Sequence, residues 1–362
     1  MNLVLLSQGL IELIISVIFG LSMFFLSFKV FSLLTKNIDE AKEISNNNVA
    51  VSILVASFIF GIMLLIKSSI GPAMETLTTV LSSKESTFIM VIIAIIRIVV
   101  FFIFFSIFAF IVLWLAIKLF TLLTTDIDEM EEIKNNNVSV SFIIATLIIS
   151  MSLILSKPLE TVLNGLVAPP SNTGINSFIT LSVFLDGLIE LGIAIVGTIF
   201  VFFLSFKIFN LLTKDIDEIK ELKSNNLAIS ILMAAFIFAI MLIIKAAIEP
   251  ANSALGFVLA DSKATALTII FVIIRIILFF ILAGVIAFVV IWISMNIFVF
   301  LTKKIDEFAE IKNKNIAVAI ILAILILSLA IMIDHSITAI LNGLIKTPEL
   351  PKDGGLIKLQ PK

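Results

Sequence analysis

Cysteine and tyrosine are absent from this 362-residue chain, histidine occurs once, and charged residues make up only 14% of it. Without cysteine there is no disulfide and no thiolate metal site, and the lone His335 has no second histidine to join it on a zinc ion. The net charge of −2 offers no basic surface to nucleic acid. Phosphate-loop, nucleophile-elbow and H-E-x-x-H motifs are also missing. We therefore expect neither an enzyme nor a protein that holds a metal, a cofactor or nucleic acid.

Hydrophobic residues are abundant instead, at 60% of the chain, and they gather in runs long enough to cross a bilayer. Lipid cannot satisfy open backbone groups, and the runs are too long and continuous for barrel strands, so we expect helices. The first run lacks a basic leader and a small-residue cleavage site, so we expect no cleavable signal peptide. The composition thus predicts an all-α, multi-pass protein whose surroundings are the lipid bilayer.

One polar segment recurs four times between these apolar runs. It spans Phe31 to Asn48, and its copies begin at Phe120, Phe209 and Phe298, each 89 residues after the last. The shared pattern is F-x-x-L-T-x-x-I-D-E-x-x-E-[I/L]-x-x-x-N. Such internal repeats decide the architecture before any other argument. Here they predict four copies of one membrane hairpin with an acidic turn.

Each copy crosses the membrane twice, so all four hairpins are predicted to be parallel and to place their turns on one face. The eight predicted transmembrane helices form hairpins at residues 9–66, 98–156, 187–244 and 276–333. Copies one and three resemble each other most, as do copies two and four. This predicts two fused four-helix domains, 1–170 and 180–345, with a linker at 171–179 and a mobile polar tail at 346–362.

Lysine and arginine are more frequent beside the turns than in the opposite connectors. The positive-inside rule then predicts cytoplasmic turns and outside termini, in a prokaryotic inner (plasma) membrane. Small residues are sparse, so we expect helix packing through Leu, Ile and Phe, and we do not expect tight Gly-x-x-x-Gly crossings to be the rule. Pro72, Pro158 and Pro250 in the outer connectors are expected to break helices.

The turn and the start of the following helix also carry a resemblance. The N-[VLI]-[AS]-[VI]-[SA] segments beginning at Asn48, Asn137, Asn226 and Asn315 follow the acidic I-D-E-x-x-E-[I/L]. In this the chain resembles the YjfL-type inner-membrane proteins, a family of unknown function whose single domain has four predicted helices. The resemblance implies two tandem copies of that domain. It implies no catalytic residues, because the family has no established activity.

The acidic turns are the candidate site. Their repeated residues are Asp39, Glu40, Glu43 and Asn48; Asp128, Glu129, Glu132 and Asn137; Asp217, Glu218, Glu221 and Asn226; and Asp306, Glu307, Glu310 and Asn315. One interpretation is structural: Asn37, Asp126 and Asp215 open short interfacial helices through a capping box, and the final Asn caps the next span. The other is functional: the carboxylates dock a basic partner, or form a ring that attracts cations.

Five charges fall in or near the outer halves of the predicted spans: Glu12, Arg97, Asp186, Glu190 and Arg275. Ionisable groups inside a membrane are costly and are functional by default. We expect the carboxylates to pair with the arginines and hold neighbouring hairpins together.

Two classes of function remain open at this point. The first is a non-enzymatic scaffold or sensor that presents the acidic turns to a cytoplasmic or membrane protein, or to further copies of itself. The alternative is a channel or transporter with a path between the two repeat domains. The scarcity of polar residues at mid-membrane favours the first class.

Overall fold

A computed structural model describes residues 3–35, 38–82, 87–124, 127–167, 176–213, 216–260, 265–303 and 305–344. The regular structure of these residues is entirely helical, which confirms the all-α prediction. The long helices are α1 (Leu3–Leu34), α3 (Val49–Ser82), α4 (Phe88–Leu123), α6 (Val138–Val167), α7 (Asn176–Leu212), α9 (Leu227–Ala260), α10 (Ala266–Leu301) and α12 (Ile316–Gly343). The short ones are α2 (Glu40–Ser45), α5 (Glu129–Lys134), α8 (Glu218–Lys223) and α11 (Glu307–Lys312).

Seven helices of the described residues are long and apolar enough to cross a membrane. The eighth predicted span is α4, which is 36 residues long and contains two shorter apolar stretches at 88–100 and 106–122. Length and composition therefore make this a multi-pass membrane protein. The predicted linker at 171–179 overlaps the start of α7, while residues 168–175 and the predicted mobile tail at 346–362 lie outside the described residues.

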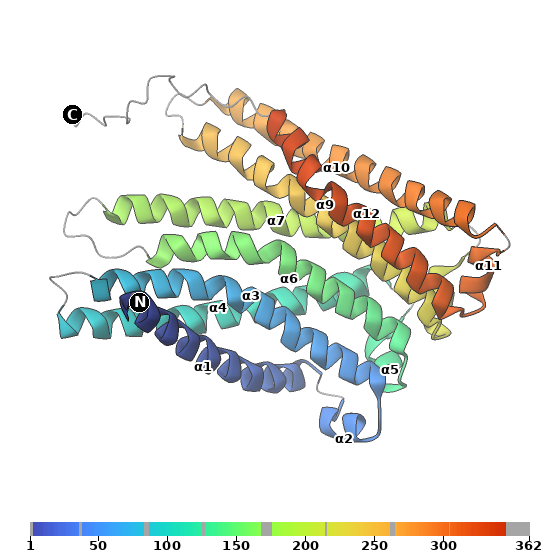
Figure 1. The fold of residues 1–362 in the computed structure, drawn as a ribbon, viewed down its shortest axis with the longest axis horizontal. Helices are drawn as coiled ribbons and strands as arrows, with labels where there is room; N and C mark the ends of the chain where they lie inside the picture. The colour runs from blue at the N-terminus through green and yellow to red at the C-terminus, as the bar shows by residue number, and fades with distance from the viewer. Residues whose placement is uncertain are drawn as a thin grey trace.

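The long helices form two layers (Figure 1). The second helices of the hairpins, α3, α6, α9 and α12, lie side by side in chain order and form what we call the central row. The first helices cover the row: α4 packs on α3 and α6, α7 on α6 and α9, and α10 on α9 and α12. Helix α1 packs mainly on α3. The arrangement is an open row, with α3 and α12 at its two ends.

The short helices connect the two layers at one end of the molecule, where Figure 1 shows α2, α5 and α11. Each begins 89 residues after the preceding one, at Glu40, Glu129, Glu218 and Glu307. Because every hairpin turns at the same end of the molecule, all four run in the same direction. The predicted parallel hairpins are confirmed.

The second helices are longer than predicted. Their predicted ends were residues 66, 156, 244 and 333, but they continue to Ser82, Val167, Ala260 and Gly343. Pro158 and Pro250 lie inside α6 and α9, and α3 continues through Pro72, so the predicted helix breaks are wrong. A proline costs its helix one N–H bond, and packing against neighbouring helices makes this loss tolerable in a membrane.

Phenylalanine dominates the largest buried side chains. Phe31 meets Phe58 edge-to-face at 5.3 Å between ring centroids, and the equivalent pair of copy three, Phe209 and Phe236, lies at 5.2 Å. Close packing of this kind is what holds helices together in lipid, because the bilayer is as apolar as the side chains.

Helices α6 and α7 cross so closely that only glycine fits. A Cβ atom added to Gly165 would lie 2.2 Å from the backbone nitrogen of Phe184, and one added to Gly187 would lie 2.4 Å from that of Val162. The contact joins a single glycine of each helix and is no Gly-x-x-x-Gly crossing, so it does not contradict the prediction that such crossings are not the rule. The chain spends two of its 14 glycines where two backbones touch.

Candidate functional site

Each acidic turn begins at the threonine of the repeated pattern. In copy two, the Thr124 N–H donates to the Phe120 carbonyl at 3.0 Å and ends α4. The Thr124 hydroxyl lies 2.8 Å from both this carbonyl and Glu129 Oε1, so its single proton is shared between the two acceptors. The Ile127 N–H then donates to the Thr124 carbonyl at 2.9 Å and closes a turn. Phe120 and Ile127 are both buried, so their side chains hold the two ends of the turn in the hydrophobic core. One hydrogen-bonded turn thus explains the spacing F-x-x-x-T-x-x-I, which is repeated in the four copies.

The aspartate of the pattern is the N-cap of the short helix. Asp128 has extended backbone angles (φ −87°, ψ 95°), and its Oδ1 accepts from the Glu131 N–H at 3.1 Å. The same cap recurs at Asp39, Asp217 and Asp306. The predicted capping box at Asn37, Asp126 and Asp215 is wrong in register, because each helix begins later. Those three residues lie outside the described residues.

The first glutamate of the pattern points inward. Glu40, Glu129 and Glu307 are buried, and each accepts a hydrogen bond from the threonine that ends the preceding helix: Thr35, Thr124 and Thr302. In copy three the half-buried Glu218 accepts from Asn210 Nδ2 at 3.3 Å. These carboxylates hold the turn to the end of the long helix before it.

The second glutamate binds the final asparagine of its own copy. Glu43 Oε2 accepts from Asn48 Nδ2 at 2.9 Å, and Glu132, Glu221 and Glu310 accept from Asn137, Asn226 and Asn315 at 2.8 Å. The Oδ1 atom of each asparagine accepts from N–H groups that open the next long helix. The predicted capping of the second helices by asparagine is confirmed.

The same asparagine amide also reaches the next copy. Asn48 Nδ2 donates to the Ile133 and Lys134 carbonyls at the end of α5, at 3.2 and 3.1 Å. Asn137 makes these bonds to Leu222 and Lys223, and Asn226 makes them to Ile311 and Lys312. We call this contact the asparagine clamp. It explains why the position requires asparagine, since one side chain must accept from its own helix and donate across the junction.

A second asparagine strengthens two of the three junctions. Asn136 Oδ1 accepts from the Ala50 N–H, and Asn225 Oδ1 accepts from the Ser139 N–H, both at 3.1 Å. These asparagines have positive φ (60° and 54°), the left-handed region that asparagine tolerates best after glycine. Their role across the junction was not predicted, although the Asn-rich end of each turn is the signal that indicates it.

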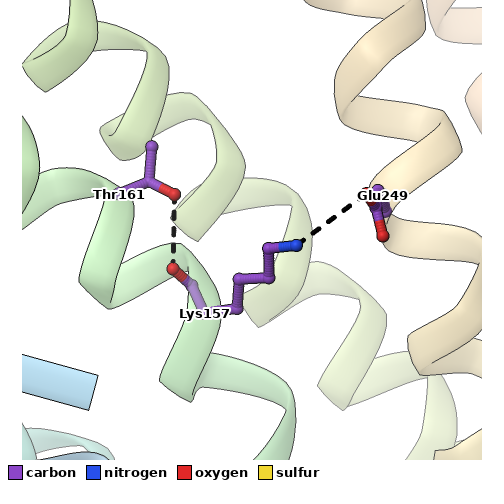
Figure 2. Close-up of polar contacts among 3 residues, drawn as sticks. All are labelled: Lys157, Thr161 and Glu249. Carbon is purple, nitrogen blue, oxygen red and sulfur yellow. Dashed lines mark hydrogen bonds and ion pairs between the residues drawn. The ribbon is translucent and has the colours of Figure 1, made fainter. Parts of the chain in front are cut away.

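The clamp also joins copy two to copy three. The long helices pack differently at this boundary, because α6 contacts α7 more extensively than it contacts α9. Lys157 of α6 and Glu249 of α9 add an ion pair at 3.8 Å across this boundary (Figure 2). Both side chains are about two-thirds exposed, and the Lys157 carbonyl also accepts from Thr161 Oγ1 at 3.3 Å. An ion pair this exposed contributes at most about 1 kcal/mol.

The five predicted intramembrane charges are not brought together in the described part of the chain. Glu12 and Asp186 are exposed, while Glu190 and Arg275 are half-buried. Among the described side chains, Arg275 makes no ion pair within 4 Å with Asp186 or Glu190. The Arg97 side chain lies outside the described residues, and so does its predicted pairing with Glu12.

Two pockets of the described residues are apolar. One of about 720 Å³ lies between α3 and α6 and is lined by Phe24, Phe60, Met63 and neighbouring apolar residues. A second of about 490 Å³ lies among α6, α9 and α12, with Phe142, Phe238 and Ile324 in its wall. Within the described ranges, no cluster of three or more His, Asp or Glu side chains is placed to hold a metal ion. The polar chemistry of the described residues is concentrated at the turns.

Comparison with known proteins gives one result. A family model described as Domain of Unknown Function (DUF350) matches residues 5–154, 98–184, 182–284 and 273–348. No curated protein and no solved structure matches the chain. The repeated matches confirm the expectation of a tandem family of unknown function, while the YjfL-type name stays a resemblance.

Proposed function

This chain belongs to the family Domain of Unknown Function (DUF350), and we propose that it is a non-enzymatic membrane scaffold or sensor that presents its four acidic turns to a protein partner. The observation that carries the proposal is the asparagine clamp. Three successive copies, through Asn48, Asn137 and Asn226, bind the end of the next short helix. The four turns therefore form one hydrogen-bonded platform, and a scaffold needs such fixed spacing.

The turns retain groups for a partner after their internal bonds are made. Asp39, Asp128, Asp217 and Asp306 are exposed, and the helix cap uses one oxygen of each, Oδ1. The other carboxylate oxygen, Oδ2, is not used by the helix cap, so a basic or N–H-rich surface of a partner can bind it. By contrast, buried Glu40, Glu129 and Glu307 support the platform from within. The excess of lysine beside the turns supports a cytoplasmic platform in a prokaryotic plasma membrane, with the termini outside.

A channel or transporter would need a polar path through the apolar layer. Two pockets of the described residues are instead lined mainly by Phe, Ile, Ala and Met side chains. This lining supports the scaffold over transport.

The test replaces the four cap aspartates by asparagine, as D39N, D128N, D217N and D306N together. Asparagine is an equally good N-cap, so the change removes charge and leaves the helix starts intact. We expect quantitative pull-down from cross-linked membranes to lose the partners that the wild type recovers, with unchanged thermal stability. Equal recovery by both forms would contradict docking through these residues. Ion flux through reconstituted liposomes above the protein-free rate would favour the channel instead.

A further inference from the structure

The row of four copies has two unused ends. At each internal junction the asparagine of one copy binds the short helix of the next. Within the described residues, Asn315 Nδ2 of copy four donates only to Glu310, and the Ile44 and Ser45 carbonyls of copy one accept from no asparagine clamp. Copy four thus has a free donor end, and copy one has a free acceptor end.

Copy one exposes the surface by which every later copy receives its predecessor. Ile44 is 41% exposed, whereas its equivalents Ile133, Leu222 and Ile311 are fully buried. Ala56 is exposed and Ile59 half-buried, although the same positions are buried in copies two to four. We call Ile44, Ala56 and Ile59, with the Ile44 and Ser45 carbonyls, the head face.

Copy four exposes the opposite surface. Ile321 of α12 is 55% exposed, but its equivalents Leu54, Ile143 and Leu232 are fully buried between helices of the central row. The same contrast holds along the helix for Ala317, Ile324 and Met332, which are exposed while the matching positions of α9 are buried. We call these four α12 residues, with the Asn315 amide, the tail face.

The polar groups at the two ends also match. At the first junction, Asn48 Nδ2 bonds two carbonyls of α5 and the Ala50 N–H bonds Asn136 Oδ1. The tail face carries the equivalent amide donor on Asn315, while the Ala317 N–H donates to Asn315 Oδ1 at 3.1 Å, as the Ala228 N–H does to Asn226 Oδ1 at the third junction. The head face carries the equivalent carbonyls, and next to it lies Asn47, whose φ of 62° matches the 60° of Asn136. Each end therefore supplies what the other lacks.

We propose that the tail face of one chain binds the head face of a second copy, so that the central row continues from chain to chain. This contact would repeat the internal junction and keep all turns on the same side of the membrane, as two chains inserted in the same sense require. It joins different surfaces of the two chains, so it builds a ring or an open row. Lipid can cover the apolar part of α12, but its mobile head groups do not present two carbonyls held side by side at the end of a helix, which the clamp binds. The proposal is independent of the scaffold role.

Cross-linking between introduced cysteines tests this contact directly, because the chain has no cysteine of its own. Ser45 and Ala317 are exposed and small, and their internal equivalents Lys134 and Ala50 flank the first junction. Chains carrying S45C and A317C together, treated in membranes with a short thiol cross-linker, should form a ladder of multimers. Mixed chains with one substitution each should form only dimers of unlike chains.

The positive control is the pair S139C and K223C, which spans the second junction inside one chain. After cleavage at a protease site introduced at residues 171–175, its cross-linked halves should stay joined. The variant N315D keeps the cap acceptor and loses the donors, so it should lower the yield of multimers roughly tenfold. An unchanged yield with N315D would overturn the proposal.

Two further outcomes would also overturn it. If either single-cysteine chain cross-links to itself as well as to the other, the contact is symmetric and joins like surfaces. If the internal control reacts and the S45C/A317C chain stays monomeric, lipid alone covers the two ends.

Discussion

Replacing Asn226 by aspartate should destabilise the monomer strongly, because the change removes every donor from the clamp and keeps its shape. Asn226 is fully buried, and its Nδ2 donates to Glu221 Oε2 at 2.8 Å and to the Ile311 and Lys312 carbonyls at 3.2 Å. Its Oδ1 accepts from the Ala228 N–H at 3.1 Å, a cap that N226D retains. The variant thus separates the clamp from helix capping.

The size of the effect follows from these contacts. A buried acceptor left without its donor costs about 1–3 kcal/mol, less where another bond remains, as the Lys314 N–H provides for the Ile311 carbonyl. Two carboxylates would also face each other where an amide met a carboxylate, and like charges repel most where water is excluded. We expect a loss of about 2–5 kcal/mol from both effects.

The matched control is N315D, at the one copy with no following neighbour. Asn315 is partly exposed and donates only to Glu310 among the described residues, so its loss should be about 1–2 kcal/mol. The difference, about 2 kcal/mol, is roughly thirtyfold in the unfolding equilibrium. Denaturant unfolding in mixed micelles at low protein concentration measures it. Adding E221Q to N226D should recover only the part due to like charges. Equal losses in N226D and N315D would refute the clamp.

Two further predictions concern the packing and the turn. G165A or G187A should cost several kcal/mol of folding stability or prevent folding, since the added Cβ lies 2.2 or 2.4 Å from backbone atoms. The control G192A, with open space around it, should be neutral or stabilising by up to about 1 kcal/mol. Parallel thermal melts compare the variants, and equal melting temperatures would rule out the close crossing. T124V should lower the free energy of unfolding by about 1–3 kcal/mol, because buried Glu129 loses a hydroxyl donor at 2.8 Å. T124S keeps the donor and should lose clearly less stability in the same unfolding assay. A loss equal to that of T124V would count against the bond.

Much of the turn was predictable because its local contacts lie a few residues apart. The capping role of Asn48 follows from a polar residue placed directly before an apolar run, and the structure confirms it. The register of the short helix was predicted wrongly, because in copies one to three two acidic or amide residues precede the helix and either can cap it. Extended backbone at Asp128 and its bond to the Glu131 N–H decide for the later one.

The contacts across copies could not be predicted in this way. Asn48 bonds the carbonyls of Ile133 and Lys134, and a carbonyl is the same whatever side chain its residue carries. Such a contact requires asparagine at one position, but it leaves no residue pattern in the sequence at the positions whose backbone carbonyls accept the bond. Burial of Glu129 was missed for a related reason, since an acidic residue in a polar turn looks exposed until its threonine partner is placed.

The amino-acid sequence by itself determined the helical class, the number of hairpins and their common direction, because apolar length and equal spacing leave lipid-embedded chains few alternatives. Tertiary structure alone decided that the hairpins form an open row, and which face of each helix meets a neighbour. Lipid is as apolar as a helix interface, so hydrophobic periodicity does not separate the exposed Ile321 from the buried Leu232. Only packing distinguishes the two.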